Sequence, residues 1–147
     1  MKFSEALQET GDPFVIRDCP RQGLPELFVE MGFTTGVEVG VYKADFTRMF
    51  AEAGLQIYGV DPYQVYDDHD PGLQARQDFV YGHAQRNLAD LPNATLIRKM
   101  SMEAVSDFAP DSLDFVYIDG NHGLRYVVED LWEWSKRVRK GGIVAGH

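Results

Sequence analysis

The chain has 147 residues, of which 44% are hydrophobic and 25% are charged, which predicts a single globular domain around one core. Its formal net charge of −9 argues against a nucleic-acid backbone as the main partner, because phosphate binding needs a basic surface. The single cysteine, Cys19, excludes a disulfide framework and is expected to be buried or half-buried. No apolar run is long enough for a membrane span or a signal peptide, so we expect a cytoplasmic protein with no membrane partner.

The pattern along the chain predicts strands that alternate with helices. Residues 1–33 are expected to form an N-terminal arm with a short helix from Pro25 to about Met31, and residues 34–147 the main domain. The elements expected in the main domain are strand 37–41, helix 44–53, strand 56–60, an acidic surface loop 67–70, helix 73–89, strand 94–98, a short helix capped by Ser101, strand 113–118, helix 124–138 and strand 143–145. This alternation predicts an α/β fold, a doubly wound parallel sheet of about five strands.

Several predicted strands end in residues that suit a ligand site. Gly40, Asp61, Ser101, Asp119 and His147 lie at the end of a predicted strand or just after it. Because the carboxyl ends of parallel strands meet at one edge of a sheet, we expect these residues to gather there and to border a ligand.

The turn after the first strand limits which ligand fits. It offers Gly40 alone, whereas a dinucleotide turn needs closely spaced glycines to approach a pyrophosphate, and the chain has no Gly-Lys-Ser/Thr phosphate loop. Glu38 would repel a pyrophosphate, but it suits a ligand that carries an ammonium or sulfonium group. Asp61, about twenty residues further on, is placed to accept hydrogen bonds from two ribose hydroxyls.

Four motifs, in this order, resemble those of the class I S-adenosylmethionine-dependent methyltransferases, and in particular the methyltransferase-24-like branch that acts on small molecules. They are Val-Glu-Val-Gly-Val-Tyr-Lys-Ala-Asp-Phe at 37–46, Gly-Val-Asp-Pro-Tyr at 59–63, Asp-Phe-Val-Tyr-Ile-Asp-Gly-Asn-His at 114–122 and Gly-Gly-Ile-Val-Ala-Gly-His at 141–147. The resemblance covers about residues 34–147 and implies a Rossmann-like fold that binds S-adenosylmethionine.

The resemblance also implies roles for individual residues. Those it places around the cofactor are Glu38 and Gly40 at the methionine part, Tyr42 and Lys43 along the turn, Asp61 at the ribose, Tyr63 near the adenine, Ser101 and Met102 beside the adenine, and Asp119 next to the methyl group and the acceptor.

The sequence departs from the pattern of this family at three points. Ala44 stands where relatives often have glycine, a mild change that should tighten the turn. The antiparallel hairpin that closes the sheet in full members is missing, so we expect a C-terminally short chain. Metal-dependent relatives hold a divalent ion through the carboxylate after the fourth strand and an acidic pair after the fifth, and His147 takes the first position of that pair. We therefore assign no metal ligands here and expect a divalent metal only in a longer parent protein.

The function predicted first is methyl transfer from S-adenosylmethionine to an oxygen or nitrogen of a small molecule, with Asp119 or His122 assisting deprotonation. For His122, a local structural role at the start of a helix remains the alternative. Two other functions stay open, a catalytically incomplete S-adenosylmethionine-binding fragment or module and, less favoured by the sparse glycines, a nicotinamide-linked oxidoreductase. An uncovered edge at the last strand would also allow a homo-oligomer to form.

Overall fold

The computed structural model describes residues 20–65 and 71–147. The expected arm up to Cys19 and the acidic loop 67–70 lie outside these residues. The centre of the fold is a five-stranded sheet in which every strand pair among the described residues is parallel, in the order β3-β2-β1-β4-β5. The strands are β1 Thr35–Val39, β2 Gln56–Val60, β3 Ala94–Ile97, β4 Leu113–Ile118 and β5 Val138–Gly146.

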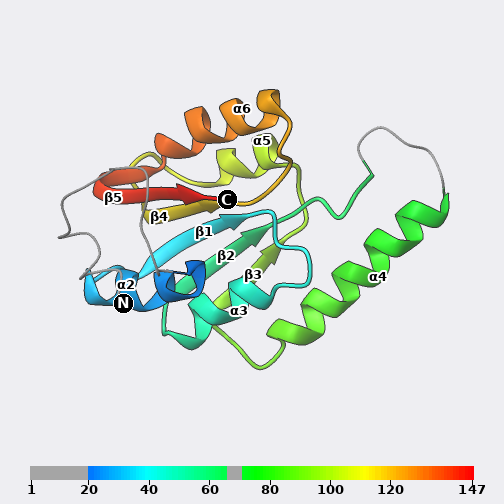
Figure 1. The fold of residues 1–147 in the computed structure, drawn as a ribbon, viewed down its shortest axis with the longest axis horizontal. Helices are drawn as coiled ribbons and strands as arrows, with labels where there is room; N and C mark the ends of the chain where they lie inside the picture. Colours follow the sequence, from blue (N-terminus) through cyan, green and yellow to red (C-terminus); the bar gives the residue numbers. More distant parts are fainter. Residues whose placement is uncertain (1–19, 66–70) are drawn as a thin grey trace.

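Helices cover both faces of this sheet, as Figure 1 shows, with α2, α3 and α4 on one face and α5 and α6 on the other. Their bounds are η1 Arg21–Gly23, α2 Leu24–Glu30, α3 Asp45–Glu52, α4 Pro71–Leu88, α5 Ser101–Ala104, η2 Val105–Asp107 and α6 Leu124–Ser135. This arrangement confirms the predicted α/β doubly wound fold. No helix within the described residues is long and apolar enough to span a bilayer.

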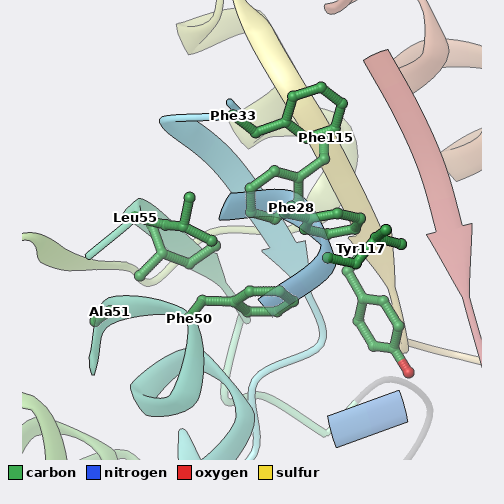
Figure 2. Packing of buried hydrophobic residues seen from close by; sticks show 9 residues of the cluster. Phe28, Phe33, Phe50, Ala51, Leu55, Phe115 and Tyr117 are labelled. Atoms are coloured by element: carbon green, nitrogen blue, oxygen red, sulfur yellow. The ribbon is translucent and has the colours of Figure 1, made fainter. Parts of the chain in front are cut away.

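An aromatic cluster fixes α2 and α3 against the centre of the sheet (Figure 2). The ring of Phe28 in α2 lies 4.4 Å from that of Phe115 in β4, and the ring of Phe50 in α3 lies 5.1 Å from Phe115, measured between centroids. Gly36 in β1 leaves room for this stack, since a Cβ atom there would lie 2.3 Å from the Phe115 ring. Burial of aromatic rings contributes a large share of core stability, so β1 and β4 form a rigid platform for whatever lies at their carboxyl ends.

The last helix and the last strand differ from their predicted bounds. Val138 was expected to continue the apolar stripe of the helix, but α6 ends at Ser135 and Val138 begins β5, which is longer than predicted. The pairing of β4 with β5 has a register shift between Leu113 and Phe115, so the strand is irregular and its sequence pattern was weak.

The apolar stripe of α6 lies largely on the surface. Leu124, Val128, Leu131 and Trp132 are exposed, and Trp134 is the fully buried large residue of this helix. Trp134 packs with Val37, Val116 and Ala104 into the core on this face of the sheet.

Candidate active site

A cavity of about 850 Å³ lies at the predicted edge of the sheet, beyond the carboxyl ends of β1, β2 and β4. Its walls also include η1, the start of α5 and the first turns of α6. A volume of this size suits a nucleoside-sized ligand together with a small second molecule.

Gly40 lets the first turn of the cavity pass directly against the end of β4. Its φ is +90°, in the left-handed region, and a Cβ atom at this position would lie 2.2 Å from the carbonyl oxygen of Asp119. Ala44 closes the same turn at φ +65° and is fully buried, which agrees with a turn tightened at this position. Only glycine allows the approach at position 40 without moving the backbone.

Glu38 lies at the base of the cavity and is 2% exposed. The hydroxyl of Thr47, in α3, donates a hydrogen bond to its carboxylate. The pKa of Glu38 is raised from 4.5 to about 8, mainly by burial and to a smaller extent by the negative charges of Asp119 and Asp61, while the Thr47 hydrogen bond and Arg21 act to lower it. A cationic group bound next to Glu38 would return this carboxyl to its ionised form.

Asp61 holds the turn that follows β1. One of its oxygens, Oδ2, accepts hydrogen bonds from the backbone N–H groups of Val41 and Tyr42, both at 3.0 Å. The other, Oδ1, accepts from the N–H of Tyr63 at 2.8 Å. Asp61 lines the cavity, and each carboxylate oxygen can accept more than one hydrogen bond, so an anchoring role leaves capacity for a ligand hydroxyl.

Ser101 and Met102 form a further wall of the cavity. Ser101 is the first residue of α5 rather than its cap, which is Met100, because its hydroxyl serves a different contact. That hydroxyl donates to the carboxylate of Asp130 in α6 and accepts from the indole Nε1–H of Trp134 at 2.8 Å. Burial raises the pKa of Asp130. The network fixes the orientation of Ser101 where it faces the cavity.

Asp119 lines the cavity at the end of β4. Its Oδ2 forms a salt bridge with the guanidinium of Arg21 at 2.6 Å, and its Oδ1 lies 3.4 Å from the Nε2 atom of His122. Arg21 is also within 3.4 Å of the Tyr117 hydroxyl and lies over the ring of Phe46. The structure therefore brings together the two predicted catalytic residues and adds a cation from η1.

Of the remaining predicted residues, two line the cavity and one is buried in the core. Tyr42 and Lys43 line the cavity along the turn, as predicted. Tyr63 does not line it: its ring is 1% exposed and packs 4.9 Å from the ring of Tyr81 in α4. Its left-handed backbone, with φ of +47°, accompanies this inward orientation, and its neighbours Pro62 and Gln64 line the cavity instead. The geometry thus offers no support for Tyr63 beside an adenine.

Arg21 and Asp130 are among the cavity residues that the sequence did not indicate. Arg21 belongs to the segment taken as an arm outside the domain, and its partner Asp119 is 98 residues away, so no local pattern indicates the contact. Asp130 lies in α6 between apolar positions, where a buried aspartate that breaks the apolar pattern was the available signal.

Carboxylates outnumber cations around the cavity. Among the described residues that line it, the six acidic side chains are Glu38, Asp45, Asp61, Asp119, Glu129 and Asp130, and the three cations are Arg21, Lys43 and Arg125. This balance disfavours a pyrophosphate and favours a ligand that carries positive charge.

Comparisons with known proteins agree with this fold. A family model described as a methyltransferase domain matches residues 36–147, while a search of curated proteins gave no match. Among solved structures, an O-methyltransferase from Bacillus cereus in complex with S-adenosylhomocysteine is similar with a TM-score of 0.65 at 15% identity, covering 85% of this chain and 54% of that one. An rRNA methylase from Streptococcus thermophilus gives a TM-score of 0.62 at 15% identity, covering 84% and 68%. Phosphoethanolamine N-methyltransferase 1 from Haemonchus contortus, in complex with phosphoethanolamine and S-adenosylhomocysteine, gives 0.57 at 15% identity, covering 84% and 25%.

The structural likenesses establish the fold, and the chain spans about half the length of the O-methyltransferase structures that it matches. The family match covers residues 36–147, which include the sheet from Gly36 onward, the turn at Gly40 and the end of β4. The chain therefore belongs to the methyltransferase-domain family of class I S-adenosylmethionine-dependent methyltransferases.

Proposed function

We propose that this chain binds S-adenosylmethionine in the cavity and transfers its methyl group to an oxygen or nitrogen of a small molecule. The observation that carries the proposal is that the buried carboxyl of Glu38, the Asp61-anchored turn and Asp119 line one cavity. The complexes of the Bacillus cereus and Haemonchus contortus enzymes with S-adenosylhomocysteine support the choice of cofactor.

In this proposal different walls of the cavity contact different parts of the cofactor. Glu38, Gly40 and the turn through Lys43 border the methionine part. Asp61 accepts hydrogen bonds from the ribose hydroxyls. Ser101 and Met102 contact the adenine, with Asp130 as a positioning residue that orients the Ser101 hydroxyl. Tyr63 has no part, because its ring is buried under α4.

When bound, S-adenosylmethionine supplies an electrophilic methyl group on a positively charged sulfur. The residues of the chain hold the acceptor in line with that methyl group, so proximity and orientation supply most of the rate enhancement. His122 or Asp119 takes the proton that the acceptor loses as its bond to the methyl carbon forms. The electron pair of the breaking carbon–sulfur bond stays on sulfur, which leaves S-adenosylhomocysteine.

Calorimetry with S-adenosylhomocysteine, S-adenosylmethionine and NAD tests the cofactor assignment. We expect both S-adenosyl compounds to bind and NAD not to bind. Asp61→Asn keeps the size of the side chain but weakens both turn and ribose contacts, and should reduce affinity by roughly tenfold or more. Tighter binding of NAD would reverse the assignment in favour of an oxidoreductase.

One observation favours a second function, that of a module that binds the cofactor without turnover. The chain spans 54% of the length of the matched O-methyltransferases, and the remainder of those proteins is available to shape an acceptor site. Radiolabelled methyl transfer to a panel of small phenols, hydroxy acids and amines, measured for this chain and for a version extended past His147, separates the two functions. Turnover by the short chain supports the enzyme, whereas cofactor binding with turnover confined to the longer version supports the module.

A further inference from the structure

Two histidines and one aspartate converge beside the cavity. Asp119 follows β4, His122 lies in the loop to α6, and His147 follows β5. One donor atom from each lies within 4.8 Å of the other two. Asp119 and His147 were expected at this edge of the sheet, and the parallel pairing of β4 with β5 brings them together, although the sequence assigned them no role as metal ligands.

The backbone holds these donors at fixed positions. The N–H of Asp119 donates to the carbonyl of Val39 at 2.7 Å, and the N–H of His147 donates to the carbonyl of Ile118 at 3.0 Å. The loop that carries His122 is held by Asn121, whose side-chain oxygen accepts from the N–H of Gly123 at 2.9 Å. The cluster is therefore attached to the sheet edge rather than to long free segments.

The distances resemble those between ligands of one small cation. The Nε2 of His122 and the Nδ1 of His147 each lie 3.4 Å from the same oxygen, Oδ1 of Asp119. Ligand atoms at zinc bond lengths in a tetrahedral site are roughly 3.3 Å apart. A charged hydrogen-bonded pair would be closer, at about 2.7–2.9 Å, so two direct ion pairs explain the arrangement less well.

The donor types decide which cation fits. The magnesium site implied by the family resemblance needs oxygen ligands in near-octahedral geometry, and two imidazoles do not provide it. One carboxylate with two imidazoles is instead a donor set for divalent transition ions such as Zn²⁺, Co²⁺ and Fe²⁺.

We propose that Asp119, His122 and His147 form a site for a divalent transition-metal ion at the edge of the cavity. Neither histidine lines the cavity, whereas Asp119 does, so the ion would lie beside the wall assigned to the methyl group. It gives His122 a role as ligand, and that role excludes proton acceptance by the same nitrogen. Arg21, which pairs with the other oxygen of Asp119, opposes the cation by charge repulsion.

The test is metal binding to the full chain, without an affinity tag, measured by calorimetry with Zn²⁺ and by visible absorption with Co²⁺. We expect micromolar or tighter Zn²⁺ binding and no Mg²⁺ binding at roughly millimolar concentration. Asp119→Asn, His122→Ala and His147→Ala should each weaken Zn²⁺ by roughly tenfold or more, and each should abolish the Co²⁺ d–d bands. Arg21→Gln should strengthen binding.

Three controls make the result decisive. His83→Ala, in α4 outside the cluster, should leave Zn²⁺ affinity unchanged. Adding one glycine after His147 moves the terminal carboxylate away and should also leave it unchanged. Circular dichroism and S-adenosylhomocysteine binding of His147→Ala should match the parent, which separates failure of the metal site from failure of the cofactor site. Wild-type Zn²⁺ affinity in both histidine variants, loss of affinity on adding the glycine, or preference for Mg²⁺ would each overturn the proposal.

Discussion

The guanidinium of Arg21 forms a 2.6 Å salt bridge with Asp119 and so joins the segment before α2 to the end of β4. Both side chains line the cavity, which places one fixed positive charge on the wall assigned to the methyl group. Whatever binds beside Asp119 therefore experiences a cation as well as a carboxylate.

Arg21→Ala should favour S-adenosylmethionine over S-adenosylhomocysteine relative to the parent chain. The former carries a positive sulfonium and the latter does not, so removing a nearby cation should change the ratio of their dissociation constants by roughly three- to tenfold. Arg21→Lys keeps the charge and should keep the ratio. The free energy of unfolding should fall by less than about 1 kcal/mol in either variant, because this ion pair is partly solvent-exposed. Calorimetry at low and high salt checks the ratio, and an unchanged ratio in the alanine variant would place the sulfonium away from Arg21.

Glu38 should make the stability of the protein depend on pH. Its pKa rises from 4.5 to about 8 on folding, so the unfolded chain loses this proton at lower pH than the folded one. Its contribution to stability is thus complete below pH 4.5, falls by at most about 1.4 kcal/mol per pH unit as pH rises toward 8, and levels off above. Urea unfolding of the parent and of Glu38→Gln at several pH values isolates the effect, because glutamine cannot titrate. Parallel stability curves for the two proteins would show that Glu38 is ionised in the folded state.

The same carboxyl should release a proton when the cofactor binds near pH 7. The ammonium of the methionine part favours the ionised form of Glu38, which is otherwise protonated at that pH. Calorimetry in two buffers of different ionisation enthalpy measures the protons released. We expect a fraction of a proton approaching one for the parent and a clearly smaller value for Glu38→Gln. Equal release by both would assign the proton to another group.

Gly40→Ala should be much more harmful than Gly54→Ala, although both glycines have φ near +90°. A Cβ at position 54 meets nothing within 4 Å, so that variant measures the backbone cost alone, about 1 kcal/mol. At position 40 the added methyl group meets the Asp119 carbonyl at 2.2 Å, which should add roughly 2 kcal/mol or more. Thermal and urea unfolding compare the two. Similar losses would mean that the end of β4 moves aside easily.

Ser101→Ala should reduce both stability and cofactor affinity. The substitution leaves the Asp130 carboxylate without its donor and the Trp134 indole N–H without its acceptor, which should cost roughly 1–3 kcal/mol of the free energy of unfolding. Ser112→Ala is the matched control: its hydroxyl makes a local bond to the Ala109 carbonyl at the surface, so it should change stability by less than about 0.5 kcal/mol. Calorimetry with S-adenosylhomocysteine checks affinity, and a destabilised but fully binding Ser101→Ala would give Ser101 a purely structural role.

The sequence was sufficient for the fold because its signals were local. The apolar patterns predicted β2 and β4 at their observed bounds, 56–60 and 113–118, although Asp114 interrupts the apolar run of β4. They placed β1 at 37–41, whereas the strand is Thr35–Val39. The boundary between α6 and β5 was wrong because Val138 fits the helical period as well as the start of a strand.

The site was predictable to the extent that it follows strand ends. Glu38, Gly40, Asp61 and Asp119 reach the cavity because parallel strands end at one edge. Tyr63 was expected near the adenine, whereas its ring packs on Tyr81 in α4, because nothing in the sequence shows that a residue two positions past a strand turns inward. The contact of His147 with Asp119 follows the same rule of strand ends, whereas that of Arg21 with Asp119 depends on tertiary approach and carries no local pattern.

The contact between Gly40 and the Asp119 carbonyl couples the turn after β1 to the end of β4, so the two cannot move independently. A backbone shift in either loop has to be passed to the other, because no atom-sized gap separates them. Changes that adapt one wall to a new acceptor would therefore disturb the wall assigned to the cofactor. We infer that acceptor preference in this fold diversifies through segments that avoid this contact, such as the one that carries Arg21, while the Gly40–Asp119 junction stays fixed.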